Sequence, residues 1–342
     1  MTLKGQTLAA KTPDAPEHQT ARASRGFDFS HFASRWGTVA AAVIIFIAFA
    51  LGNERFVSID NLSNVLVQIS VLMVISSGLT VAVASGEFDL SIGQAASLAG
   101  VLVAGMLVLS QLSVPVAIAV ALASGIVIGL VNGLLVTLLR IPSLIATLAM
   151  GPIALGVNYA YTGGDSIYAQ MPDSFYAIAK GKVLGIVPMP IVIALITVFV
   201  FYVLLNRTRL GRSVIATGAN IQAARLSGIK VNRARVTALV LSAAGAALGG
   251  VMLTARLGTG QSGAGDAYLM DSLTAVFLGM TAFKPGRATI QGTLVGVVII
   301  GMLDNGLNLV GAPFYLQNIV RGVVMVAAVG LAVLRGEIRF FR

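Results

Sequence analysis

The chain has 342 residues, of which 57% are hydrophobic and 11% are charged, and it contains no cysteine. Soluble globular proteins carry about 25% charged residues, so this composition excludes a water-soluble enzyme. The absence of cysteine excludes disulfides, a thiolate nucleophile and Cys-ligated metal. Both histidines, His18 and His31, lie in the polar N-terminal stretch, which excludes a His-based catalytic or metal site in the rest of the chain. We expect no metal site and no catalytic residue. A net charge of +10 suggests a nucleic-acid partner, but the positions of the basic residues indicate membrane lipids and no nucleic acid.

In chain order, a polar segment is followed by a series of long apolar segments. Residues 1–35 hold eight charges and are expected to form a disordered cytoplasmic tail. A membrane-spanning helix needs about 20 mostly apolar residues, and the sequence therefore predicts an all-α, polytopic membrane protein with about ten transmembrane helices, some of them discontinuous. The membrane domain would cover residues 36–335, before a cytoplasmic tail at 336–342. The ten apolar segments lie near 36–53, 63–85, 90–110, 112–139, 143–162, 183–205, 236–257, 267–283, 288–311 and 315–334.

The basic residues predict the orientation of these spans, because cytoplasmic loops are enriched in Lys and Arg. With ten spans and a cytoplasmic N-terminus, 18 basic residues lie in cytoplasmic segments and four in external loops, while Arg321 lies inside a span. Seven of the 18 fall between Arg207 and Arg235. Both termini are therefore predicted to be cytoplasmic.

Glycine residues recur at helical spacing along several of these segments. Gly125, Gly129 and Gly133 share one helical face, as do Gly245 and Gly249. Faces of this kind allow helix backbones to approach closely in lipid. We therefore expect these glycines to serve helix packing.

The segment from Ser85 to Gly93 carries two carboxylates, Glu87 and Asp89, inside a long apolar run. One interpretation is a tight turn in which Asp89 or Ser91 caps the next helix. The other is a break in a discontinuous helix at a solute path. In both cases the carboxylates are expected to face water, a helix N-terminus or protein donors rather than lipid.

The longest internal connection, residues 206–235, is predicted to be cytoplasmic. Asn220 fits the N-cap of a short helix over about 221–227, and Gly228 fits its C-terminal stop. Such a helix is too short to be stable alone and suits docking against another protein. The alternative is a basic loop that binds anionic lipid headgroups.

Polar residues inside the predicted spans form the third group of candidates, because ionisable groups at membrane depth are expensive and often functional. Asp304 and Arg321 are placed symmetrically about the turn near Pro313, so we expect them at similar depth as a structural ion pair. Hydrogen bonds between helices explain many buried Asn side chains equally well. The candidates for the helix break or a translocation path are Glu87, Asp89, Ser91, Asn132, Asn158, Asp271 and Asn305.

At these residues the chain resembles the permease subunits of ribose-type sugar importers of the ATP-binding cassette class. The family pattern Gly-Gly-Ile-Asp-Leu-Ser-Val-Gly is similar to residues 86–93, with Glu87 and Phe88 departing from it. The family loop Gly-Arg…Ala-x-Gly-x-Asn-x-x-Ala-Ala-Arg-Leu-Ser-Gly-Ile is similar to residues 211–212 and 216–229. Lys284-Pro285-Gly286-Arg287 stands where the family usually has Gly-Gly-x-Gly. The resemblance covers about residues 40–335, and the loop is its most specific part.

The resemblance implies a multi-pass subunit of the bacterial inner membrane that pairs with a second permease copy or a paralogue. Separate ATPase subunits, which carry ATP and Mg, and a periplasmic or surface-tethered solute-binding protein would complete the importer. The chain has no Gly-x4-Gly-Lys-Ser/Thr motif, so no P-loop ATP hydrolysis and no bound cofactor are expected on it. The residues that the resemblance assigns to ATPase coupling are Arg212, Asn220, Gln222, Ala223, Ala224, Arg225 and Gly228.

The expected solute is a monosaccharide or sugar alcohol. A branched-chain amino acid permease is the alternative within the class, since those permeases are distantly similar. A self-sufficient ion-coupled transporter is a second alternative, in which Glu87, Asp271 or Asp304 would bind the ion. A structural or receptor protein of the membrane is a third alternative, and it would need no solute path.

Overall fold

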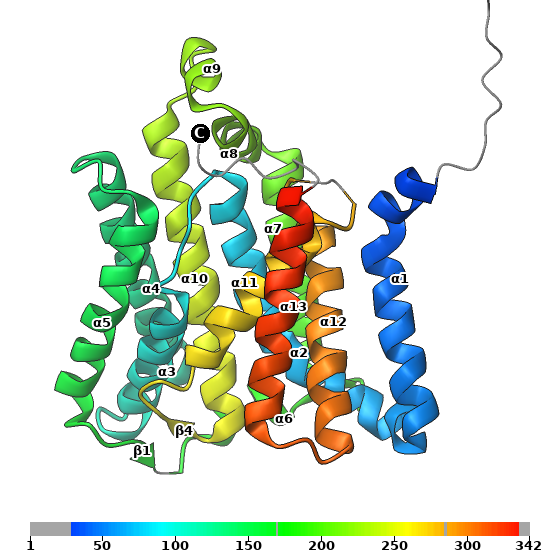
Figure 1. Cartoon of the computed structure of the whole chain (residues 1–342). Helices are drawn as coiled ribbons and strands as arrows, with labels where there is room; N and C mark the ends of the chain where they lie inside the picture. Colours follow the sequence, from blue (N-terminus) through cyan, green and yellow to red (C-terminus); the bar gives the residue numbers. More distant parts are fainter. Residues whose placement is uncertain (1–28, 169, 284–285, 335–342) are drawn as a thin grey trace, which may run out of the picture.

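The computed structural model describes residues 29–168, 170–283 and 286–334, and these form a bundle of helices with two very short antiparallel strand pairs (Figure 1). The long helices are α1 (Phe29–Gly52), α2 (Ile59–Ala84), α3 (Ile92–Val108), α4 (Val114–Thr137), α5 (Ser143–Thr162), α7 (Met189–Arg207), α10 (Val231–Leu257), α11 (Asp266–Met280), α12 (Ile290–Leu309) and α13 (Phe314–Leu334). The shorter elements are η1 (Glu54–Val57), β1 (Ile167–Tyr168), α6 (Asp173–Lys180), β2 (Lys182–Val183), β3 (Val187–Pro188), α8 (Arg209–Ala219), α9 (Ile221–Leu226) and β4 (Thr259–Gly260).

Each of the ten predicted apolar segments coincides with one of the long helices. Six of these helices, namely α2, α4, α5, α7, α10 and α12, are long and apolar enough to cross a membrane. Helix α1 begins at Phe29, several residues before the predicted start at 36, because residues 29–35 contain no helix-breaking Gly or Pro. The rest of the expected N-terminal tail, residues 1–28, and the expected tail at 336–342 lie outside the described residues.

Helix α10 is the centre of the bundle and packs against α4, α2 and α3. The predicted glycine faces meet here: a Cβ atom added at Gly129 of α4 would lie 2.5 Å from the Cα of Val240 in α10. On the opposite side of α10, a Cβ added at Gly245 would lie 3.1 Å from the Cα of Gly78 in α2. The expectation that glycines serve close backbone packing is therefore confirmed at these positions.

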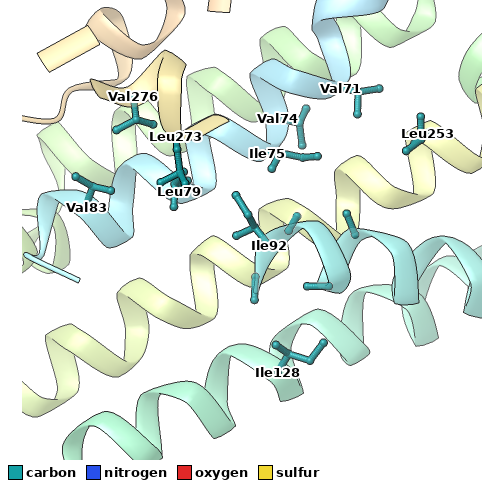
Figure 2. Packing of buried hydrophobic residues seen from close by; sticks show 14 of the residues in the cluster. Val71, Val74, Ile75, Leu79, Val83, Ile92, Ile128, Leu253, Leu273 and Val276 are labelled. Atoms are coloured by element: carbon teal, nitrogen blue, oxygen red, sulfur yellow. The ribbon is translucent and has the colours of Figure 1, made fainter. Parts of the chain in front are cut away.

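The main hydrophobic cluster joins the start of α3 to its neighbours. Figure 2 shows Ile92 between side chains from α2, among them Ile75, and Ile128 of α4. Leu273 and Val276 of α11 belong to the same cluster. The N-terminal end of α3 is therefore embedded in the helical body rather than placed at its surface.

The two ends of the bundle differ in structure. Helices α8 and α9 lie at one end, whereas α6 and both strand pairs lie at the other (Figure 1). Strand β1 pairs with β4 through Ile167↔Gly260, and β2 pairs with β3 through Lys182↔Pro188. The elements at these two ends are called the α8–α9 end and the strand end below.

Candidate functional site

Residues 85–91 interrupt the chain between α2 and α3, where the two carboxylates predicted a break. Helix α2 ends at Ala84 near the α8–α9 end, and the chain then runs back into the bundle before α3 begins at Ile92 (Figure 1). Gly86 makes the reversal possible with a φ of +84°, a conformation that side chains with a Cβ rarely adopt. The segment is thus a re-entrant connection.

Hydroxyl groups of α5 satisfy the backbone of this re-entrant connection. Ser143 Oγ accepts a hydrogen bond from the backbone N–H of Phe88 at 3.1 Å, and Thr147 Oγ1 accepts one from Leu90 at 3.0 Å. Irregular backbone at membrane depth is tolerated only where protein or water satisfies it. Sequence reasoning missed Ser143 and Thr147; their signal was two small hydroxyl residues at i, i+4 spacing on one helix face.

Asp89, Ser91 and Asn132 form a buried polar chain at the start of α3. Asp89 Oδ1 accepts hydrogen bonds from the backbone N–H of Ser91 at 3.1 Å and from its hydroxyl at 2.6 Å. Asn132 of α4 donates from Nδ2 to Ser91 Oγ at 2.9 Å. The structure therefore brings together three of the predicted residues, and Asp89 faces protein donors rather than lipid.

Glu87 links the same connection to the first turns of α10 through an ion pair. Its carboxylate is only 3% exposed and forms an ion pair with Arg235. Beside it, a Cβ added at Gly86 would lie 3.5 Å from the Cα of Gly218 in α8. Hence the re-entrant connection touches both α8 and the first turns of α10, on either side of α9.

A second re-entrant connection, residues 258–265, precedes α11 and was not predicted. It leaves α10 at the strand end and returns into the bundle, where α11 begins at Asp266 (Figure 1). The sequence had suggested only an external loop here; the missed signal was the run of glycines at 258, 260, 263 and 265.

The starts of α3 and α11 meet inside the bundle. A Cβ added at Gly93 would lie 3.1 Å from the carbonyl oxygen of Gly265. Ser97 Oγ accepts a hydrogen bond from the backbone N–H of Gly265 at 2.9 Å, and Gln94 Nε2 donates to Asp266 Oδ1 at 2.5 Å. Two interrupted helices that approach from opposite ends are a recurrent way to build a solute path through a membrane.

Asp304 and Arg321 are in contact, as their symmetric placement about the turn predicted. Arg321 Nη2 lies 2.8 Å from Asp304 Oδ1, and Arg321 Nε donates to the same oxygen at 2.9 Å. Asp271 of α11 is a further member that the turn symmetry did not reveal, since Arg321 Nε lies 3.4 Å from its Oδ1. One guanidinium therefore faces two carboxylates from two different helices.

The remaining in-span candidates lie apart from the re-entrant connections. Asn305 exchanges two 2.9 Å hydrogen bonds with Asn61 of α2, which makes it a tie between helices. Asn158 is fully buried on α5, and neither atom of its amide has a hydrogen-bond partner among the described residues. Neither residue joins the cluster around Asp89.

The α8–α9 end contains the short helix expected after Asn220. The Asn220 side chain accepts a hydrogen bond from the backbone N–H of Ala223 at 2.9 Å, and Gly228 has the positive φ of +78° that ends the helix. The longer α8, capped by Thr208, was not predicted. Arg212, Gln222, Ala223 and Arg225 are exposed.

Of the α9 residues expected at a docking surface, Ala224 is the one that the structure buries. Ala224 is only 4% exposed, because it packs towards the body of the protein, so it is not available to a partner. Leu226 is 90% exposed and is therefore the apolar residue that α9 presents to its surroundings.

Comparisons with known proteins agree with this architecture. Residues 61–329 match the family described as "Branched-chain amino acid transport system / permease component". The ribose import permease protein of Bacillus subtilis (strain 168) is 39% identical over 302 residues, which cover 88% of this chain and 93% of the relative.

Two relatives from Escherichia coli (strain K12) match over a similar span. Its ribose import permease protein is 38% identical over 314 residues, covering 91% of this chain and 97% of the relative. Its L-arabinose transport system permease protein is 33% identical over 303 residues, covering 89% and 92%. No solved structure matches the chain.

Proposed function

We propose that this chain forms the transmembrane path of an ATP-driven importer for a monosaccharide or related polyol. The chain belongs to the family of branched-chain amino acid transport system permease components. It is a multi-pass protein of the bacterial inner membrane and a permease of the sugar-importing kind. The observation that carries the proposed solute class is the near full-length similarity to permeases named for ribose and for arabinose.

The two re-entrant connections support a transport role over a purely structural one. A structural membrane protein has no need for helices that start inside the bundle at the cost of irregular backbone. In this chain α3 and α11 both start there, and their first residues carry polar side chains. Interrupted helices with polar ends favour a solute path.

The ion pairs of the three candidate ion-binding residues favour an ATP-driven importer over an ion-coupled transporter at these positions. An ion-coupling site needs a carboxylate that is free to bind a proton or sodium. Glu87 is paired with Arg235, and Asp271 and Asp304 both lie within 3.4 Å of Arg321. The three residues that were candidates for ion binding are thus each in contact with an arginine, and Asp271 and Asp304 share Arg321.

The partners follow from the same proposal. ATP and Mg would bind to a separate ATPase subunit that docks at the α8–α9 end, and a solute-binding protein would deliver the sugar at the strand end. A second permease copy or a paralogue would complete the path. Exposed Leu226, together with Arg225 and Gln222, forms the proposed ATPase contact.

The test compares two leucines that are almost equally exposed at opposite ends, Leu226 at 90% and Leu184 at 91%. In the importer reconstituted with its ATPase and binding protein, Leu226→Asp should lower ATP-dependent uptake of radiolabelled sugar at least tenfold and release the ATPase during purification. Leu184→Asp should retain the ATPase, because it lies at the other end.

Two results would contradict the proposal. Retention of the ATPase and of uptake by Leu226→Asp would mean that α9 is not the docking element. Absence of ATP-dependent uptake of D-ribose, L-arabinose and every other pentose, hexose or sugar alcohol by the wild-type importer would refute sugar transport itself.

A further inference from the structure

Gln94 and Asp266 lie side by side where α3 and α11 begin. Gln94 Nε2 donates to Asp266 Oδ1 at 2.5 Å, whereas Gln94 Oε1 has no hydrogen-bond partner among the described residues. The junction around them is fixed by backbone contact between Gly93 and Gly265 and by Ser97. The pair therefore offers a carboxylate and an amide in a defined geometry.

Asp266 differs from the other carboxylates near the middle of the bundle. Glu87, Asp271 and Asp304 are buried and face arginine. Asp89 is buried as well and accepts hydrogen bonds from Ser91. Asp266 is exposed, and over residues 29–168, 170–283 and 286–334 no Lys or Arg nitrogen lies within 4.0 Å of its carboxylate. A carboxylate of this kind is strongly disfavoured against lipid, so Asp266 requires water or a polar ligand in front of it.

The depth of the pair follows from helix lengths. At a rise of about 1.5 Å per residue, α10 spans about 40 Å, α11 about 22 Å and α3 about 25 Å. Helices α3 and α11 run towards opposite ends from their meeting point, so this point lies close to the middle of the bundle. A polar pair at that depth whose carboxylate, Asp266, is exposed marks a water-accessible surface inside the membrane.

The surface that carries the pair is bordered by helices α5 and α13. Helix α3 packs against α5, α11 packs against α13, and α3 and α11 pack against each other (Figure 1). Ala267 and Met270 of α11 are exposed on the same stretch of chain. One protomer leaves this surface open, which agrees with a path closed by a second permease chain.

We propose that Gln94 and Asp266 contact the hydroxyl groups of the transported solute as it passes the middle of the membrane. This inference rests on the proposed function and assigns residues to it. The Asp266 carboxylate accepts a hydrogen bond from one hydroxyl, while the second N–H of Gln94 Nε2 donates to a neighbouring one. Neighbouring hydroxyls are the feature that pentoses, hexoses and sugar alcohols share. Neither residue is arranged to bind an anion, because within the described residues no Lys or Arg nitrogen lies within 4.0 Å of the Asp266 carboxylate.

The first test measures transport by the complete importer in proteoliposomes, with the radiolabelled sugar that the wild type takes up from a panel that includes D-ribose and L-arabinose. Asp266→Asn and Gln94→Ala should each lower the maximal uptake rate at least tenfold, whereas ATPase activity stimulated by the binding protein persists. Glu54→Gln is the matched control, since Glu54 is an exposed carboxylate of η1 beside α1 at the edge of the bundle, and it should leave uptake unchanged.

The second test asks whether water reaches this surface, and it does not depend on the hydrogen bond. The cysteine-free chain allows single thiols at Ala267 and, as the matched control, at Val200, which is exposed near the middle of α7. A water-soluble methanethiosulfonate reagent should modify Ala267→Cys at least tenfold faster than Val200→Cys, and saturating sugar during turnover should slow the modification.

The outcomes separate the two proposals. If the wild type takes up no sugar, the proposed function is wrong and this inference falls with it. If the wild type transports sugar but Asp266→Asn and Gln94→Ala transport it at the same rate, the contact is refuted. Equal thiol reactivity at positions 267 and 200 refutes the water-accessible surface. Both refutations leave sugar transport standing.

Discussion

Arg321 carries one positive charge between two carboxylates, and this imbalance decides how single substitutions behave. Arg321→Gln would leave Asp271 and Asp304 buried without a cation, and breaking a buried pair in this way costs roughly 3–5 kcal/mol. Asp304→Asn should cost much less, because Arg321 keeps Asp271 as a partner. The measurement is the thermal midpoint of the detergent-solubilised protein.

The double and triple variants test the coupling between these charges. Asp304→Asn with Arg321→Gln should be less destabilising than the sum of the two single changes, and adding Asp271→Asn should recover further stability. Strictly additive losses would mean that the contacts seen among the three side chains contribute nothing.

The Asp304–Arg321 contact could be predicted because both residues flank one turn. The contact of Asp271 with Arg321 could not be predicted. Because α11 starts inside the bundle, the position of Asp271 within its apolar segment does not give the depth of Asp271 in the membrane.

At the scale of elements, the sequence indicates the re-entrant connection at residues 85–91 but not the one at residues 258–265. Glu87 and Asp89 interrupt an apolar run, and charged groups inside such a run predict irregular backbone. Residues 258–265 are mostly small and carry no charge, so the hydropathy pattern shows only a loop between two spans and gives no sign that the chain returns into the bundle. Helix α8 was missed for a related reason: its apolar face is short and docks on α7, α10 and α2, a tertiary contact that local pattern does not reveal.

The connection at residues 85–91 is also placed to move with the α8–α9 end. Gly218 of α8 lies against the backbone of Ala84, and Glu87 is paired with Arg235 just after α9. A displacement of α8 and α9 by a partner would therefore reach residues 85–91 and the start of α3 directly. The movement would be transmitted through two direct contacts, Gly218 with Ala84 and Glu87 with Arg235.

Charge reversal at this pair tests the coupling. Glu87→Arg and Arg235→Glu should each reduce uptake at least tenfold, because like charges would face each other in a buried site. The double reversal should restore part of the uptake, since the opposite charges are merely exchanged. ATPase activity stimulated by the binding protein, measured in parallel, distinguishes uncoupling from misfolding. A double variant no better than the worse single one would count against the pair as a link.

At the scale of the whole molecule, the orientation in the membrane follows from the distribution of basic residues between the two ends. The cluster from Arg207 to Arg235 includes α8 and α9, whereas Lys180 and Lys182 lie at the strand end. Basic loops remain in the cytoplasm during insertion. The α8–α9 end is therefore expected to face the cytoplasm and the strand end the exterior.

Single cysteines at Leu184 and Leu226, the two most exposed leucines among the described residues, test this orientation, because the natural chain contributes no thiol of its own. In intact spheroplasts a membrane-impermeant maleimide should label Leu184→Cys within minutes and leave Leu226→Cys unlabelled. After permeabilisation both should react at similar rates, since both positions are about equally exposed. Labelling of Leu226→Cys from outside would reverse the orientation and would place the proposed ATPase contact on the wrong side of the membrane.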